Sequence, residues 1–237
     1  MAFFDIHTHM APRIDDGSKN DEMTLEMLKK SYMSGVDHII LTPHYNEPHR
    51  MMAVISQDLL EHMRELAHRV SEDIRIYAGN EIFFTSNTKT VLQGGQAASL
   101  AGSNYVLLEF SYSVSGSELI SAVNEVRMCG YWPILAHVER YDCIYEKGFP
   151  ERLVSAGAYL QMNAGFIMSA NFKANRFISK LIKGNLLSFI GSDCHNVTSR
   201  SPNIGRCAEI LNKKYGCEIT ERLLRHNPEK IIKNERL

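Results

Sequence analysis

Two histidines close the first hydrophobic segment of the chain. His7 and His9 follow Phe3–Ile6, a short run with the character of a β-strand. Residues two apart in a strand point to the same face, so the two imidazoles would lie side by side, a geometry that suits the binding of one metal ion. Histidines also occur at strand ends for ordinary packing reasons. The pair alone is therefore weak evidence for a metal site, and further candidate ligands elsewhere in the chain are needed to support it.

Polar residues follow most of the other hydrophobic segments as well. The strand-end residues and one acidic residue in the first loop give these candidate metal ligands: His7, His9, Asp16, His44, Glu81, Glu109, His137, Asp193 and His195. Several carboxylates in one place are electrostatically unfavourable unless cations bind among them. Mixed histidine and carboxylate ligands favour Mn, Fe or Zn over a lone Ca or Mg ion. The set is larger than one ion needs, so we expect a cluster of two or three metal ions.

A repeated pattern predicts the elements that position these residues. Four helical segments end at a glycine, and each glycine is followed by a short hydrophobic strand and a polar residue. The glycines are Gly35, Gly130, Gly157 and Gly184. Glycine at this place is typical of a left-handed helix cap that leads into a strand.

Three further strands complete the predicted sheet, at residues 2–9, 74–82 and 104–110. Strands that are almost entirely apolar and alternate with helices indicate a parallel sheet buried on both faces. The pattern has no linker-like break, so we expect one α/β domain over residues 1–237. Its architecture would be a closed or nearly closed seven-stranded β/α (TIM-like) barrel, in which the C-terminal strand ends open onto one face.

The composition excludes several classes of protein. The 237 residues are 44% hydrophobic and 22% charged, with a formal net charge of −1. Without a basic excess, a general nucleic-acid binder is not expected. No apolar run approaches membrane-spanning length, so we expect no membrane insertion. The five cysteines are irregularly spaced and do not form a disulfide framework. We therefore expect a cytoplasmic protein with reduced thiols.

The order of the motifs resembles the PHP superfamily, named for polymerase and histidinol phosphatase. The motifs are H-x-H, IDDG, TPH, GNEI, LLEF, AHVERY and GSDCHN, and they cover nearly the whole chain. They are most similar to the CpsB/YwqE-type metal-dependent protein-tyrosine phosphatases of bacterial capsule and exopolysaccharide synthesis. The resemblance implies a distorted seven-stranded barrel of the PHP type with three metal ions, usually Mn²⁺, while Fe and Zn remain alternatives.

The resemblance also implies how the ligands are shared among the ions. One ion would be held by His7, His9, Glu81 and Asp193. A second would be held by Glu81 as a bridge, Glu109 and His137, and a third by Asp16, His44 and His195. Arg140 and Arg200 would be the phosphate-binding arginines, because a planar guanidinium matches phosphate oxygens. The alternative for each arginine is a surface salt bridge.

A rival phosphatase motif lies in the last of these segments. Cys194 to Ser201 spells Cys-x5-Arg-Ser, the pattern of thiol-dependent tyrosine phosphatases, in which a thiolate attacks phosphorus. The five intervening residues contain no glycine, whereas such a loop must turn its N–H groups toward the anion. A thiolate would also leave the histidine and carboxylate strand ends unexplained. We therefore interpret Cys194 as a small spacer between Asp193 and His195.

The expected reaction is metal-assisted hydrolysis of phosphotyrosine on a protein. Metal ions lower the pKa of water, while the arginines hold the phosphoryl oxygens. The resemblance implies that the partner is a bacterial tyrosine kinase of polysaccharide synthesis; an oligomer is left open. A histidinol phosphatase or another small-molecule phosphoesterase would share the metal site and is the alternative. A non-catalytic adaptor would be expected to lack ligands or arginines.

Aromatic residues stand beside several ligands in the sequence, and two interpretations of them are open. They are Tyr45, Phe83, Phe84, Phe110, Tyr112 and Tyr141. Some of them would form an aromatic rim that packs against the phenyl ring of phosphotyrosine. Alternatively, they would fill the upper layer of the barrel as core.

Overall fold

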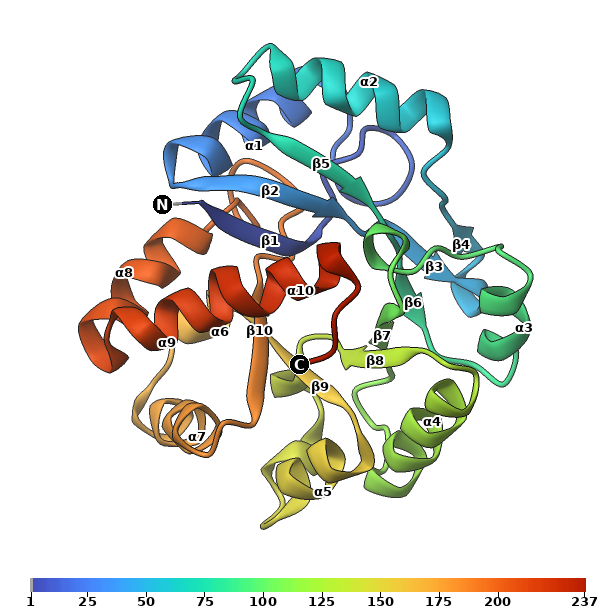
Figure 1. The fold of residues 1–237 in the computed structure, drawn as a ribbon, viewed down its shortest axis with the longest axis vertical. Coiled ribbons are helices and arrows are strands. Elements are labelled where there is room, and N and C mark those ends of the chain that lie inside the picture. Colours follow the sequence, from blue (N-terminus) through green and yellow to red (C-terminus); the bar gives the residue numbers. More distant parts are fainter. Residues whose placement is uncertain (1) are drawn as a thin grey trace.

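Strands and helices alternate along most of the chain in the computed structural model, which describes residues 2–237 (Figure 1). The strands are β1 (Phe3–Thr8), β2 (Val36–Leu41), β3 (His44–Asn46), β4 (Met51–Met52), β5 (Arg75–Ala78), β6 (Glu81–Phe83), β7 (Tyr105–Glu109), β8 (Trp132–Leu135), β9 (Tyr159–Asn163) and β10 (Leu187–Gly191). The helices are α1 (Asp21–Met33), α2 (Gln57–His68), α3 (Thr88–Gln93), α4 (Gly116–Met128), α5 (Phe149–Ala156), α6 (Ala164–Met168), α7 (Phe172–Lys183), α8 (Ile204–Tyr215), α9 (Cys217–Glu221) and α10 (Asn227–Lys233).

The strands form two sheets. The smaller has the order β1-β2-β5, and the larger has the order β10-β9-β8-β7-β6-β3-β4. All pairings are parallel except that of β3 with the short edge strand β4. The sheets meet where an isolated parallel bridge joins Thr8 to Cys194 and the N–H of Asp193 donates to the carbonyl of His7 at 2.9 Å. The fold is therefore mixed α/β, and its described strands do not form one continuous closed sheet.

Two of the predicted strands are interrupted. The segment after Gly35 divides into β2 and β3 on either side of Pro43, which has no N–H to donate to a neighbouring strand. The segment 74–82 divides into β5 and β6 on either side of Gly79, where a side chain would come within 2.8 Å of Leu100 Cδ2. The hydrophobic pattern predicted each as one strand, although proline and glycine are both residues that interrupt strands.

The predicted glycine caps are confirmed at three of the four positions. Gly35, Gly130 and Gly157 have φ values of 89°, 89° and 98°, in the left-handed region. Gly184 was predicted wrongly, since its φ is −80° and the left-handed residue is Asn185, with φ 53°. Asparagine tolerates this conformation better than most residues, so it takes the place that glycine has in the other three units.

Both faces of the strands are buried. One apolar cluster lies between the strands and the surrounding helices, where α2 for example contributes Met63 and Leu66. A second, smaller cluster includes Ile6, Tyr105 and Phe189 from three strands and Ile231 from α10, which packs across β1 and β10. Figure 1 shows the helices around the outside and the C-terminal helices across the centre of the view. No helix in residues 2–237 is long and apolar enough to cross a membrane.

Candidate metal and phosphate site

The structure brings the nine predicted ligands together at one end of the strands. His7 and His9 lie at the end of β1, and Glu109 ends β7. His44 and Glu81 begin β3 and β6, just beyond the ends of β2 and β5. The remaining members follow β8 and β10, apart from Asp16, which lies in the loop after β1. The parallel order of the strands explains this convergence, because their C-terminal ends open onto the same face.

Glu81 is the centre of the cluster. Its Oε2 atom lies 3.2 Å from His7 Nε2, 3.3 Å from His9 Nε2 and 3.0 Å from His44 Nδ1. Its Oε1 atom lies 2.8 Å from His137 Nε2. Burial raises the pKa of this carboxyl group, but the surrounding imidazoles outweigh it and hold the pKa well below its usual range. Glu81 is therefore a buried anion contacted by four histidines.

Two further carboxylates flank this centre. Asp16 Oδ1 lies 3.3 Å from His195 Nε2 and 3.4 Å from His44 Nε2, and these two imidazoles lower the pKa of Asp16. Glu109 Oε1 lies 3.5 Å from His137 Nε2, and its Oε2 lies 3.9 Å from His44 Nδ1. His44 thus contacts three carboxylates, which places it between the two sides of the cluster.

Three sets of side chains offer ligand atoms that all lie within 4.8 Å of one another. The sets are His9, Asp16, His44 and His195; His7, His9 and Glu81; and His44, Glu81 and Glu109. They overlap with the sharing of ligands implied by the resemblance but differ in detail, because His44 replaces His137 beside Glu109. Asp193 Oδ1 lies 3.6 Å from both His7 Nε2 and His9 Nε2.

Buried atoms without hydrogen bonds show that the site fits divalent cations. Glu81 Oε2 and His195 Nε2 are buried, and their contacts with His44 Nδ1 at 3.0 Å and Asp16 Oδ1 at 3.3 Å do not have the geometry of a hydrogen bond. An unsatisfied buried polar group costs about 1–3 kcal/mol, which a metal ion bound there would offset. The donor set of imidazole nitrogens and carboxylate oxygens suits Mn, Fe or Zn.

The histidine pKa values show that protonated imidazoles can balance the negative charge of the carboxylates in the absence of a bound cation. Burial lowers the pKa of His9, but Asp15 and Glu81 outweigh it and raise the pKa to about 9. The same competition raises the pKa of His44 to about 11, through Asp16 and Glu81, and that of His137 to about 9, through Glu109 and Glu81. Protons on the imidazoles then balance the negative charge. Metal binding must displace these protons, because an imidazole ligand is neutral.

Both predicted phosphate-binding arginines reach the cluster through Asp193. Arg140 Nη2 donates to Asp193 Oδ2 at 2.8 Å, and Arg200 Nη2 donates to Asp193 Oδ1 at 2.7 Å. Asn163 Nδ2 also donates to Asp193 Oδ2, at 2.8 Å. The arginine side chains are 29% and 40% exposed, so their remaining N–H groups are accessible to a ligand at the mouth of the site.

Two of the candidate ligands have an unusual backbone conformation. His137 has φ 32° and Asp193 has φ 54°, both in the left-handed region that favours glycine. Such residues cost about 1–3 kcal/mol each and occur preferentially at functional sites. The conformation places these side chains beside Glu81 and between the two arginines, respectively.

Two supporting residues were missed by the sequence analysis. Asp15 Oδ2 accepts a hydrogen bond from His9 Nδ1 at 2.7 Å and one from the backbone N–H of His44 at 3.2 Å. Gln161 Oε1 accepts from the N–H of His137 at 2.8 Å and lies 3.2 Å from His7 Nδ1. Each fixes the ring nitrogen that faces away from the cluster, which leaves Nε2 directed into it. A signal was present for Gln161, since it is polar within a buried strand.

The geometry opposes a thiolate mechanism. Cys194 is fully buried, and burial raises the pKa of its thiol well above the usual range. A nucleophilic cysteine needs the opposite, a lowered pKa and access to the substrate. Arg200, the arginine of the rival motif, donates to Asp193.

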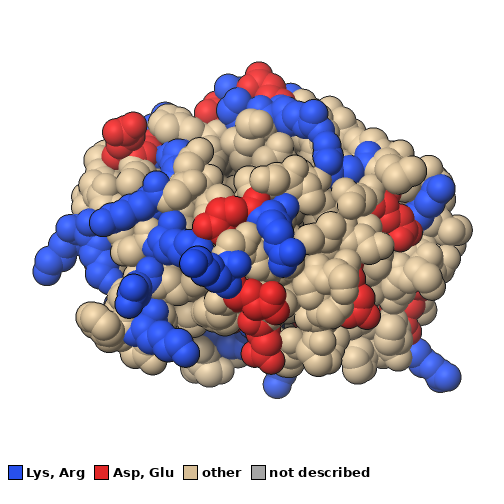
Figure 2. All heavy atoms as spheres, turned by 90° about the horizontal axis from the view of Figure 1, so that it is seen from below, with Lys and Arg blue, Asp and Glu red and all other residues tan. Residues whose placement is uncertain are grey.

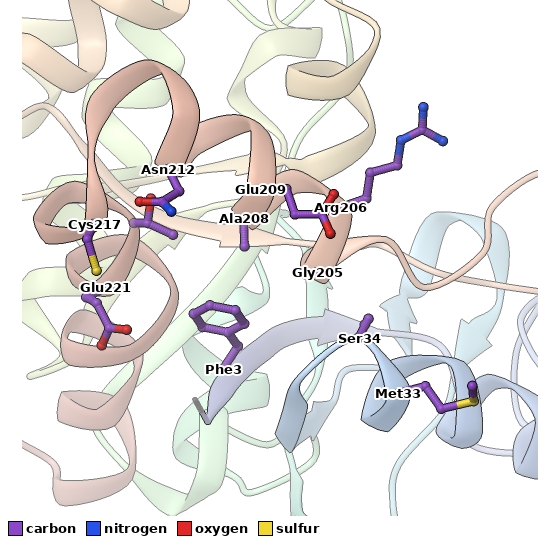
Figure 3. A pocket seen from close by; sticks show the side chains of 11 residues that line it. Phe3, Met33, Ser34, Gly205, Arg206, Ala208, Glu209, Asn212, Cys217 and Glu221 are labelled. Carbon is purple, nitrogen blue, oxygen red and sulfur yellow. The ribbon is translucent and has the colours of Figure 1, made fainter.

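The aromatic residues divide between the two interpretations. Tyr45, Phe110 and Tyr141 are buried and belong to the core. Tyr112 is 62% exposed, and with Phe83 and Glu109 it lines a pocket of about 260 Å³ beside the cluster. A second cavity, of about 600 Å³, lies at the opposite ends of the strands, between Phe3, Ser34 and Cys217 (Figure 3), and shares no residue with the site.

Comparison with known proteins gives one consistent result. The family model for capsular polysaccharide synthesis proteins CpsB/CapC matches residues 3–233. The tyrosine-protein phosphatase CpsB of Streptococcus pneumoniae is 32% identical over 98% of both chains. A structure described as one of the metal-dependent tyrosine phosphatases YwqE of Bacillus subtilis and CpsB of S. pneumoniae superposes with a TM-score of 0.88 at 26% identity, covering 99% of this chain and 96% of the other. The phosphotriesterase homology protein of Escherichia coli shares the fold alone, with a TM-score of 0.62 at 12% identity and 98% of both chains covered.

Proposed function

Because the chain belongs to the CpsB/CapC family of capsular polysaccharide synthesis, we propose that it is a metal-dependent protein-tyrosine phosphatase. One observation carries the proposal most directly: a cluster of histidines and carboxylates centred on Glu81 adjoins two arginines fixed on Asp193. The cluster supplies cation ligands and the arginines supply phosphate ligands. A metal-dependent phosphomonoesterase needs both in one site.

The predicted residues have distinct roles in this proposal. All nine candidate ligands would hold the metal centre, which is expected to contain three Mn²⁺ ions. Divalent ions held there supply Lewis-acid chemistry and a nucleophile at neutral pH. Asp15 and Gln161 orient His9 and His7. Arg140 and Arg200 bind the phosphoryl oxygens and stabilise their charge in the transition state.

The pocket beside Glu109 is suited to the leaving group. Phe83 and Tyr112 line it, and an aryl ring would pack against them with a contribution of about 1 kcal/mol per contact. A phenolate, with a pKa of about 10, leaves more readily than an alkoxide and depends less on a general acid. These features favour phosphotyrosine over phosphoserine.

We also propose finer points of architecture and biology, which family membership supports. The two sheets together would form a distorted seven-stranded barrel, in which β2 and β3 count as one interrupted strand and β5 and β6 as another. The bridge between Thr8 and Cys194 supports closure of the barrel between β1 and β10. The substrate would be a phosphotyrosine-bearing kinase of polysaccharide synthesis, encountered in the cytoplasm.

Activity on three phosphoesters tests the proposal. We expect kcat/KM for a phosphotyrosine peptide to exceed that for the matched phosphoserine peptide by at least about a hundredfold, from leaving-group ability and ring packing together. Chelation of the metal should abolish both activities. Histidinol phosphate is the third substrate, and a higher kcat/KM for it would establish the small-molecule phosphatase instead.

A further inference from the structure

A groove lies beside the candidate site, and none of the candidate ligands or phosphate-binding arginines lines it. Its volume is about 740 Å³. The residues that line it come from the segment after β8 and from helices α6 and α7. They include Asp142, Tyr145, Phe166, Lys173, Arg176 and Phe177.

The groove opens at the same end of the strands as the metal and phosphate site. Tyr145 Oη donates to the carbonyl of Glu139 at 2.8 Å, and Glu139 directly precedes Arg140. On the other wall, α6 begins immediately after Asn163, which donates to Asp193. Both walls are thus continuous with the residues that hold the two arginines. A polypeptide with its phosphotyrosine in the site could therefore reach this groove.

The charged residues of α7 are all cationic. Its sequence, FKANRFISKLIK, contains no acidic residue, and its cationic residues are Lys173, Arg176, Lys180 and Lys183. Their spacing of three, four and three places them along one face of the helix. Figure 2 shows Lys and Arg side chains gathered on the side of the molecule where α7 lies in Figure 1. Lys173 in the first turn also stands at the positive end of the helix dipole, where a cation is unfavourable unless an anion binds nearby.

Among residues 2–237, Lys180 is the only one of these four cations that forms an ion pair. Lys180 pairs with Glu151 at 2.9 Å. Within residues 2–237, no carboxylate lies within 4.0 Å of a nitrogen of Lys173 or Arg176. Asp142 is the acidic residue that lines the groove, so the cations outnumber it there. In a chain with a formal net charge of −1, this local excess is not a consequence of overall composition.

The groove also has an aromatic wall. The rings of Tyr145 and Phe177 lie 4.5 Å apart at an angle of 44°, and Phe166 lines the same space. Cations beside aromatic faces suit a polypeptide that alternates acidic and apolar or aromatic side chains. A flat anionic surface would fit this groove less well, because it could not enter the groove and contact the aromatic walls.

We propose that this groove is a docking site for an acidic segment of the polypeptide that carries the phosphotyrosine. The inference rests on the proposed phosphatase function and adds a determinant of substrate choice outside the metal site. Lys173 and Arg176 would attract the acidic side chains, and the aromatic wall would pack against the rest of the segment. Electrostatic contacts of this kind act mainly on encounter and on affinity, so KM should change and kcat should not.

The test compares two phosphotyrosine peptides that differ only in whether the flanking residues are glutamate or glutamine. We expect the wild-type protein to favour the glutamate peptide by about tenfold in kcat/KM, and the preference to disappear at high salt. The variant K173E/R176E should lose the preference through KM, with activity on free phosphotyrosine unchanged. Both residues are exposed, so the charge reversals are compatible with folding.

The matched control is R64E/R69E, which makes the same change of net charge at exposed positions of α2 and its C-terminal cap. It should keep the preference for the glutamate peptide. Equal cleavage of the two peptides by the wild-type protein, or equal loss in the control, would overturn the docking proposal. Binding to anionic lipid vesicles that K173E/R176E abolishes, without any peptide preference, would assign the patch to a membrane surface instead. If the wild-type protein hydrolysed neither peptide, the proposed function itself would be wrong.

Discussion

Replacing Asp15 by asparagine tests whether the cluster depends on residues that touch no substrate. Asp15 Oδ2 accepts hydrogen bonds from His9 Nδ1 and from the N–H of His44, while its Oδ1 accepts from the N–H of Gly17 at 3.0 Å. An amide in this place can keep the contact with Gly17, but its NH₂ group then faces two donors. His9 must either lose its partner or change tautomer, and the second outcome directs an N–H at the metal site.

The expected loss follows from these contacts. Removing a hydrogen-bonded carboxylate behind a metal-binding histidine typically lowers metal affinity by about 10- to 100-fold. We therefore expect the Asp15→Asn variant to need about 10- to 100-fold more Mn²⁺ for half-maximal activity, with kcat restored at saturating metal. Calorimetric titration of the metal-free protein with Mn²⁺ measures the same affinity without turnover.

Asp37→Asn is the matched control. Asp37 Oδ1 lies 2.7 Å from His38 Nδ1, the same distance as in the Asp15–His9 pair, but outside the site. This variant should bind Mn²⁺ like the wild type. Wild-type Mn²⁺ affinity in the folded Asp15→Asn variant would refute the reasoning, because His9 would then not need its carboxylate partner.

Three further predictions concern other parts of the molecule. EDTA should abolish activity and Mn²⁺ should restore it, while Cys194→Ser should stay within about tenfold of wild type; an inactive Cys194→Ser with EDTA-resistant wild type would favour the thiolate mechanism. Arg200→Ala should lower kcat/KM by about a hundredfold or more with unchanged metal content by elemental analysis, and loss of metal would instead assign the arginine to ligand support. Burial raises the pKa of Asp5 from 3.8 to about 6, so its folded form binds protons more tightly and stability falls as pH rises through this range. Asp5→Asn should remove that fall, and the difference between the two unfolding free energies should change by about 2 kcal/mol between pH 4 and pH 7; a constant difference would contradict the assignment.

The sequence was most informative about the candidate ligands. Parallel strands bring their C-terminal ends together, so the polar residue after each strand could be assigned to one face without knowledge of the packing. His137 and Glu81, separated by 56 residues in the chain, were predicted to meet on this basis, and their side chains lie 2.8 Å apart. The resemblance added the arginines, which pattern alone could not separate from surface residues.

Details that depend on side-chain direction were not predictable. Asp15 and Asp16 are adjacent and chemically identical, yet one supports His9 from behind and the other faces His44 and His195. Their roles follow from the turn of the loop, which no periodicity encodes. By contrast, the breaks at Pro43 and Gly79 were predictable in principle, because proline and glycine both interrupt strands.

The two arginines on Asp193 have a consequence for the order of binding events. Oδ1 and Oδ2 of this one carboxylate hold Arg200 and Arg140, and Oδ1 also faces His7 and His9. A metal ion that binds the Asp193 carboxylate would therefore weaken the hydrogen bonds from Arg140 and Arg200 to this carboxylate. The two guanidinium groups would then be free to bind an incoming anion. Metal and inorganic phosphate should then bind cooperatively, and thermodynamic linkage requires the effect to be mutual. The factor by which Mn²⁺ tightens phosphate must equal the factor by which phosphate tightens Mn²⁺, so the product of the reaction would help to retain the metal.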